Sequence, residues 1–114
     1  MITGIGCDIL EIKHFKDIFE RFPSFLNKVY SKKEIEEYHK RKDDIRYLAS
    51  RFCAKEAIFK ALTKYEYDFN TIEIINDTNN TPIVNFLNGD KHKIFVSISY
   101  ENDYVLAYAI LSTI

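Results

Sequence analysis

The chain has 114 residues and a formal net charge of -1, with 46% hydrophobic and 29% charged residues. This balance predicts a single globular domain over residues 1–114 and excludes a chain that is disordered as a whole. Because the net charge is close to zero, no overall field favours a nucleic acid or a membrane surface as a partner.

The first ten residues alternate as the residues of a β-strand do. Gly4, Gly6 and Asp8 face one side of this strand, and the odd-numbered, mostly apolar residues face the other. Two glycines weaken a strand, so their presence indicates that another segment approaches the backbone closely on that side.

Helical patterns follow this strand. Apolar residues recur every three or four positions over about 11–22, which predicts an amphipathic helix that a proline ends. After a loop, Ser31 and Glu34 form the Ser-x-x-Glu pattern of a capping box and predict a short polar helix over about 31–41. The longest helix is expected over about 44–64.

The rest of the chain is rich in Ile, Val, Phe and Tyr between turn signals. These segments predict strands over 71–75, 83–87, 93–100 and 104–111, the last two close enough to form a hairpin. One strand, three helices and three or four antiparallel strands predict an α+β fold with helices packed on one face of an antiparallel sheet.

No apolar run approaches the roughly 20 residues that span a bilayer, and the start of the chain lacks the regions of a signal peptide. The two cysteines, Cys7 and Cys53, lie far apart inside apolar segments and indicate neither a disulfide framework nor a zinc site. We therefore expect a cytoplasmic protein with reduced thiols.

Two carboxylates are candidates for a metal site. At about 100° per residue, Glu56 lies on the apolar stripe of the long helix, where a carboxylate needs a cation, hydrogen bonds or a metal. The structural alternative is an ion pair with Lys60. Asp8 either caps the first helix or binds a divalent cation at the end of the glycine-containing strand. Oxygen donors without a histidine or cysteine partner suit Mg²⁺, with Mn²⁺ as an alternative.

Basic residues cluster on and around the long helix. Lys60 lies one turn beyond Glu56, where its ammonium could reach a phosphate held by the metal. For Arg46 and Lys64 we favour the ordinary solvated side of an amphipathic helix. Tyr100 is interpreted as a core or rim aromatic, because an unperturbed tyrosine pKa of about 10 makes a poor general base near neutrality.

Three segments carry a family resemblance: GIGCDILEI at 4–12, RFCAKEAIFKAL at 51–62 and VSISYENDYVLAYA at 96–109. Together they resemble the holo-[acyl-carrier-protein] synthases, which are small 4'-phosphopantetheinyl transferases. The resemblance implies that fold and a transferase that moves the 4'-phosphopantetheine moiety of coenzyme A to a serine of apo acyl carrier protein. The reaction would release adenosine 3',5'-bisphosphate and serve fatty acid biosynthesis.

The resemblance also implies roles for individual residues. Asp8 and Glu56 would bind Mg²⁺ and act in catalysis with Lys60, which would contact a phosphate near the scissile bond. Family members are typically homotrimers with sites between neighbouring subunits. The substrate-binding residues implied are Arg51, Lys55, Lys60 and Tyr100, and the residues that face the carrier protein are Lys13 and His14.

The chain departs from the family pattern in three places. Tyr100 stands where the family usually has a histidine, His14 stands where it usually has an arginine, and 63–65 replace a glycine-containing loop. These departures leave open a non-catalytic module of the same fold that binds coenzyme A, a nucleotide or the carrier protein. A metal-dependent phosphohydrolase that uses the same carboxylates with water is a further alternative.

Overall fold

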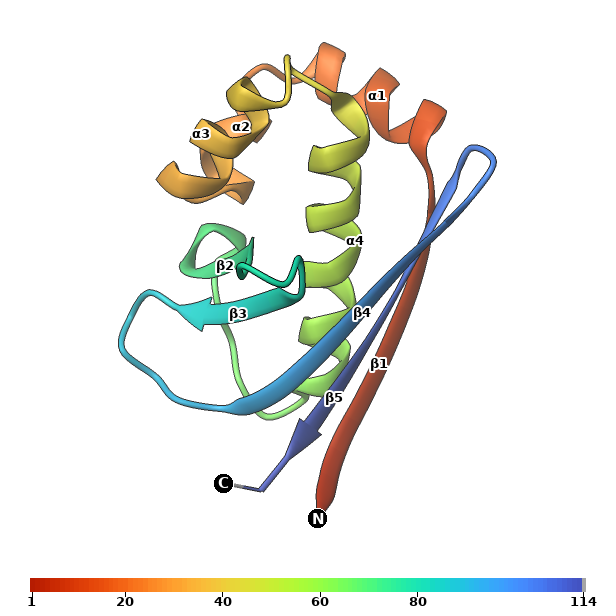
Figure 1. Cartoon of the computed structure of the whole chain (residues 1–114). Helices are drawn as coiled ribbons and strands as arrows, with labels where there is room; N and C mark the ends of the chain where they lie inside the picture. Colours follow the sequence, from red (N-terminus) through yellow and green to blue (C-terminus); the bar gives the residue numbers. More distant parts are fainter. Residues whose placement is uncertain (114) are drawn as a thin grey trace.

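The computed structural model describes residues 1–113, and its elements follow the predicted order (Figure 1). A five-residue helix, α2, lies where the sequence pattern predicted only a loop. The helical elements are α1 (Ile12–Arg21), α2 (Phe25–Val29), α3 (Lys32–Lys40), α4 (Ile45–Ala61) and the 3-10 turn η1 (Phe69–Thr71). The strands are β1 (Ile2–Glu11), β2 (Ile72–Asn76), β3 (Pro82–Phe86), β4 (Lys93–Glu101) and β5 (Tyr104–Ser112).

Local signals account for the helix starts. Ser31 caps α3 with the full capping box, in which its side chain accepts from the Glu34 amide and the Glu34 side chain accepts from the Ser31 amide. Asp44 caps α4 by accepting from the Arg46 amide at 3.0 Å. The capping box predicted from the sequence is therefore confirmed.

The described strands form two antiparallel sheets. One has three strands in the order β1-β5-β4, and the other pairs β2 with β3. The α+β fold class is confirmed, but the single sheet that the sequence suggested is divided. The Glu34 carboxylate in α3 accepts a hydrogen bond from the Ile74 amide at 2.9 Å and so holds β2 against the helical layer. β2 and β3 therefore form a sheet of their own and do not extend the larger sheet beyond its edge strand β4.

The long helix α4 packs directly on β1, across the three-stranded sheet (Figure 1). A Cβ atom on Gly4 would collide with the carbonyl oxygen of Ala61, and one on Gly6 would collide with that of Ala57. The close approach predicted from the two glycines is therefore confirmed, and α4 is the segment that makes it.

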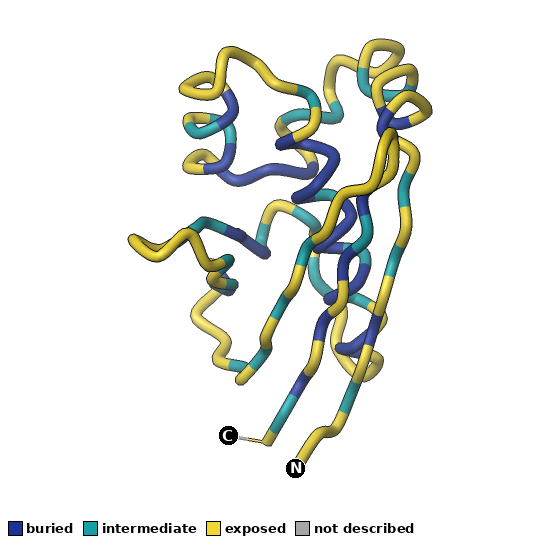
Figure 2. The backbone as a smooth tube through the Cα atoms, turned by 45° about the vertical axis from the view of Figure 1, so that its right-hand side comes forward, coloured by how far each residue is buried: buried dark blue, intermediate teal, exposed yellow. Residues whose placement is uncertain are grey.

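Burial alternates along the strands of the larger sheet (Figure 2). The β5 residues Val105, Ala107 and Ala109 are buried beneath α4. The opposite, outer face of the sheet has no covering element among the described residues and carries large exposed apolar side chains. These side chains are Ile5, Ile9, Phe95, Tyr104, Tyr108 and Ile110.

None of the helices within residues 1–113 is both long enough and apolar enough to cross a membrane. Both thiols are free, with Cys7 exposed and Cys53 buried. Burial, helped by the nearby Asp8 charge, raises the pKa of the Cys53 thiol to about 12. Cys53 is therefore an inert part of the core.

Candidate active site at the junction of β1 and α4

Asp8, Glu56 and Lys60 gather where β1 meets α4. The Lys60 ammonium lies 3.3 Å from Asp8 Oδ1 and donates to the Cys7 carbonyl oxygen at 2.9 Å. Glu56 precedes Lys60 by one turn of the same helix. The Lys60 side chain is 55% exposed and that of Asp8 is 22% exposed, so the cluster opens to solvent.

This geometry decides between the structural alternatives for the two carboxylates. Asp8 does not cap the first helix, because Glu11 is the N-cap residue of α1. Within residues 1–113, the ion pair of Lys60 is with Asp8 rather than with Glu56. Asp8 is therefore not used as a cap, and Glu56 is not the partner of Lys60.

The electrostatics of the cluster favour a cation. Partial burial raises the pKa of Glu56, the Asp8 charge raises it further, and only the Lys60 charge lowers it. Two carboxylates and one ammonium leave a local excess of negative charge, which a divalent ion would relieve.

The donor set fits Mg²⁺. This ion takes oxygen ligands, keeps several waters and is often bound by one or two carboxylates together with substrate phosphates. Residues 1–113 contain no group of three or more His, Cys, Asp or Glu side chains that could hold a metal. The remaining ligands would therefore be water and a phosphate.

Lys55 occupies a different environment from the one predicted for it. Its side chain is fully buried, and its ammonium donates to Glu34 Oε1 and the Val29 carbonyl at 2.6 Å each, and to the Phe69 carbonyl at 3.0 Å. The Lys55 ammonium therefore joins α4 to α2, α3 and η1. In this arrangement it does not line the cluster around Glu56.

Arg51 and Tyr100 line a separate pocket of about 450 Å³ between α4, β4 and the β2–β3 turn. The Arg51 guanidinium donates to Asn76 Oδ1 at 2.9 Å and lies 4.7 Å from the centre of the Tyr47 ring. Arg46, expected to be merely solvated, lies over the Tyr100 ring at 5.0 Å. These predicted substrate contacts are near β4, whereas Asp8 is on β1 at the other edge of the sheet.

Lys13 and His14 are exposed in the first turn of α1. Because α1 begins directly after β1, both residues follow Asp8 closely in the chain. They lie on the accessible surface that continues from the end of β1.

Comparison with known proteins identifies the family. The model of the 4'-phosphopantetheinyl transferase superfamily matches residues 4–109. The chain is 40% identical to a holo-[acyl-carrier-protein] synthase of Clostridium botulinum (strain Alaska E43), with 100% of both chains covered. The chain belongs to the holo-[acyl-carrier-protein] synthase family. It is therefore a phosphopantetheinyl transferase.

Solved structures agree with this assignment. The fold matches the crystal structure of holo-[acyl-carrier-protein] synthase from Neisseria meningitidis with a TM-score of 0.88 and 28% identity, covering 99% of this chain and 100% of that one. It matches the Helicobacter pylori enzyme, solved in complex with coenzyme A, with a TM-score of 0.79 and 28% identity, covering 95% of this chain and 99% of that one.

A groove whose lining includes Glu56 was not predicted from the sequence. This groove of about 760 Å³ has apolar lining from Phe59, Leu62 and Phe69, and its lining also includes Tyr65 and Tyr67. The loop after α4 supplies several of these residues and carries no motif. The one signal in the sequence was the replacement of the glycine-containing loop at 63–65.

Proposed function

We propose that this transferase moves the 4'-phosphopantetheine moiety of coenzyme A to a serine of apo acyl carrier protein, with Mg²⁺ dependence. The observation that carries the proposal is the accessible cluster of Asp8, Glu56 and Lys60 at the junction of β1 and α4. The similarity to holo-[acyl-carrier-protein] synthases, one of them solved with coenzyme A, supports the choice of substrates. A role in fatty acid biosynthesis in the cytoplasm completes the proposal.

The proposed chemistry assigns one task to each residue. Asp8 and Glu56 would hold Mg²⁺ or Mn²⁺, and the bound ion would neutralise charge on the diphosphate of coenzyme A. Lys60 would turn from Asp8 to donate to a phosphoryl oxygen near the scissile bond. The serine oxygen would then bond to the β-phosphorus and lose its proton to solvent, the bond from that phosphorus to the bridging oxygen would break, and adenosine 3',5'-bisphosphate would leave.

Arg51 and Tyr100 would bind the substrate from a neighbouring subunit. In one chain their pocket and the Asp8 cluster lie near opposite edges of the β1-β5-β4 sheet. A head-to-tail contact between copies would bring one edge against the other, and such contacts form a ring when the rotation between copies closes. The exposed apolar outer face of the sheet supports burial between copies. The family resemblance favours a homotrimer.

The carrier protein would approach over the first turn of α1. Lys13 and His14 are exposed there and follow the strand that carries Asp8. A basic surface next to the metal cluster suits an acidic carrier protein whose serine must reach the phosphate.

The non-catalytic alternative is favoured by one observation. Tyr100 lies beneath Arg46 and stands where the family usually has a histidine, so the contribution of that histidine to binding or proton transfer is missing at that position. This alternative predicts binding of coenzyme A without transfer, whereas a phosphohydrolase would break down coenzyme A without a carrier protein.

Intact-mass spectrometry of apo acyl carrier protein, incubated with the transferase, coenzyme A and Mg²⁺, tests the proposal. We expect a mass gain of one phosphopantetheine that disappears with EDTA, with Asp8→Asn and with Glu56→Gln. Lys64→Ala, which changes an exposed lysine beyond the end of α4, is the matched control and should retain transfer. An unmodified carrier with coenzyme A still bound would support the binding module, and free breakdown products would support the phosphohydrolase.

A further inference from the structure

Two loops that are far apart in sequence meet beside the groove that begins at Glu56. Tyr67 follows α4, whereas Asp90 and His92 belong to the connection between β3 and β4. The Tyr67 hydroxyl lies 2.7 Å from Asp90 Oδ2 and 2.6 Å from His92 Nε2. These bonds therefore fix the loop after α4 to another part of the fold.

The single phenolic proton decides the direction of both bonds. An ionised carboxylate only accepts, so Tyr67 donates to Asp90. The Tyr67 oxygen then accepts from His92, whose Nε2 must carry a proton. Burial and the hydrogen bond to Asp90 raise the pKa of Tyr67 to about 12, so the hydroxyl keeps its proton at neutral pH.

Ring packing holds the same residues in place. The His92 imidazole meets the Tyr65 ring with 4.5 Å between centroids and the Phe86 ring with 4.8 Å. Tyr67 also packs on Phe86 at 5.2 Å, and Phe86 is part of the hydrophobic core. We call this group the Tyr67 clamp. Its members are Tyr65, Tyr67, Phe86, Asp90 and His92.

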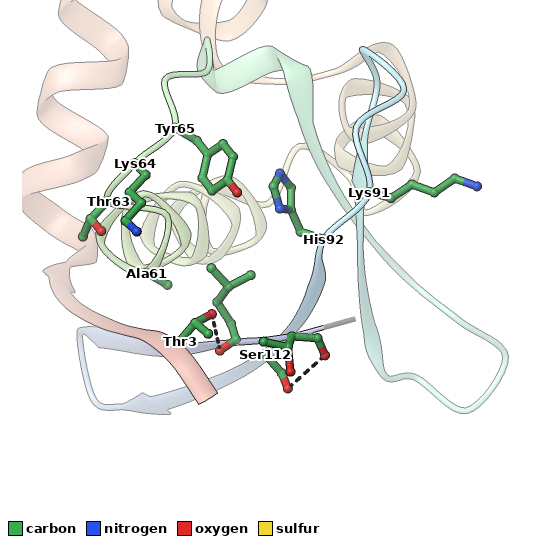
Figure 3. Close-up of a pocket in the computed structure, with 10 residues that line it drawn as sticks. Thr3, Ala61, Thr63, Lys64, Tyr65, Lys91, His92 and Ser112 are labelled. Atoms are coloured by element: carbon green, nitrogen blue, oxygen red, sulfur yellow. Dashed lines mark hydrogen bonds between the residues drawn. The ribbon is translucent and has the colours of Figure 1, made fainter. Parts of the chain in front are cut away.

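The Tyr67 clamp separates two hollows of the surface. Tyr65 and Tyr67 line the groove of about 760 Å³ whose lining includes Glu56. Tyr65 and His92 also line a second pocket of about 430 Å³, where Figure 3 shows the two rings next to each other. A shift of the loop over 62–68 would therefore change the shape of the groove close to Glu56.

We propose that Tyr67 is a positioning residue: held between Asp90 and His92, it keeps the loop over 62–68 in the conformation that walls the groove. The groove would hold the part of coenzyme A that extends from the phosphates near Glu56, so this inference rests on the proposed function. Tyr67 does not touch the reacting atoms. Its hydroxyl is needed for binding of coenzyme A rather than for the chemical step.

The decisive variant is Tyr67→Phe, which keeps the ring packing and removes only the hydroxyl. We expect the KM for coenzyme A to rise about five- to tenfold, the worth of one or two hydrogen bonds, with kcat within about twofold. The KM for the carrier protein should stay unchanged. His92→Leu should raise the KM for coenzyme A in the same way. His92→Gln keeps an N–H donor and should raise it less.

Tyr38→Phe is the matched control. It removes the hydroxyl of a tyrosine on α3, which lines neither the groove nor the second pocket and takes no part in the bonds to Asp90 and His92. We expect unchanged kinetics. An unchanged KM for coenzyme A in folded Tyr67→Phe would overturn the proposal, and so would a loss confined to kcat.

Calorimetric titration of coenzyme A in buffer with Mg²⁺ separates this inference from the proposed function. If the natural protein binds coenzyme A but transfers nothing, the proposed function fails. The role of Tyr67 in binding can still be tested, by comparing the Kd for coenzyme A of the natural protein with that of Tyr67→Phe. A higher Kd for Tyr67→Phe supports it, and equal Kd values overturn it. No measurable binding by the natural protein would overturn both.

Discussion

At the scale of single residues, Lys55 and Glu56 have opposite roles although they are neighbours in the chain. They point to different sides of α4, because successive helical residues are rotated by about 100°. The Lys55 ammonium is buried against Glu34, whereas Glu56 shares its surroundings with Asp8 and Lys60. The protein neutralises the first charge itself and leaves the second incompletely balanced. That imbalance distinguishes the structural ion pair of Lys55 from the candidate metal site at Glu56.

Glu56→Gln should separate stability from function. Because burial and Asp8 raise the folded-state pKa of Glu56, its stabilising contribution is present below the unfolded pKa and is lost as the pH rises through the folded value. At pH 7 without metal, the variant should therefore be more stable than the natural protein, by an amount that solvent screening keeps small.

Urea unfolding at several pH values measures this difference. The advantage of Glu56→Gln should vanish below about pH 4, where the natural glutamate is protonated too. Added Mg²⁺ should stabilise the natural protein and leave the variant unchanged. A variant that is less stable than the metal-free natural protein at pH 7 would contradict this account of the site.

Lys55→Met should strongly lower the free energy of unfolding. The change leaves the Glu34 carboxylate buried without its ammonium and removes the donor to two backbone carbonyls. Breaking a buried pair from one side costs about 3–5 kcal/mol. Denaturant unfolding measures the loss, and Lys64→Met, at an exposed lysine, should change stability by less than about 0.5 kcal/mol. A stable Lys55→Met protein with only a raised KM would restore Lys55 as a substrate contact.

At the scale of elements, the contact of β1 with α4 builds the site. The glycines let the helix backbone lie directly on the strand, which brings Lys60 within reach of β1. β1 is an edge strand, and its Cys7 carbonyl accepts from the Lys60 ammonium. The same packing that stabilises the fold therefore sets the spacing between Asp8 and the α4 side chains.

Gly6→Ala tests this packing. The added methyl group would collide with the Ala57 carbonyl and crowd the Lys60 Cβ, and neither backbone can yield without separating strand from helix. Overpacking of this kind costs about 1–3 kcal/mol. We expect that loss in thermal unfolding, together with reduced transfer at temperatures where the variant is still folded. Thr3→Ala, at an exposed position of the same strand, should change neither property.

At the scale of the whole molecule, the two faces of the β1-β5-β4 sheet differ in what covers them. α4 covers the inner face, whereas the outer face exposes Ile5 by 71% and Tyr108 by 54%. Exposed apolar surface of this kind marks an interaction site. The proposed trimer would bury it and unite the two parts of the substrate site.

Tyr108→Glu should dissociate the assembly. A carboxylate in the middle of this face cannot be buried between copies without a partner. Sedimentation velocity should change from the trimer to the monomer, and transfer should fall at least about tenfold because neither edge of the sheet completes the site alone. Leu87→Glu, at an exposed apolar residue outside the sheet, is the control and should preserve both. A natural protein that sediments as a monomer and is fully active would contradict the proposal.

Apart from α2, the order and type of the main helices and strands could be predicted from the sequence, since periodicity, caps and turns are local. Ser31 and Glu34 identified the start of α3. The glycines of β1 predicted that another segment packs closely on the strand, and the structure shows that this segment is α4. The motifs around Asp8 and around Glu56 and Lys60 predicted the members of the central cluster, because the family resemblance depends on residue types in a fixed order.

Only the tertiary structure decided which charged side chains are buried and paired and which are accessible. Nothing in the sequence separates Lys55 from the other basic residues of its segment, yet contacts from α2, α3 and η1 enclose its side chain. Likewise, no local pattern joins Tyr67 to Asp90 and His92, which lie 23 and 25 residues away. The physical reason is that burial and pairing depend on contacts between distant segments, whereas sequence patterns report the backbone geometry of near neighbours.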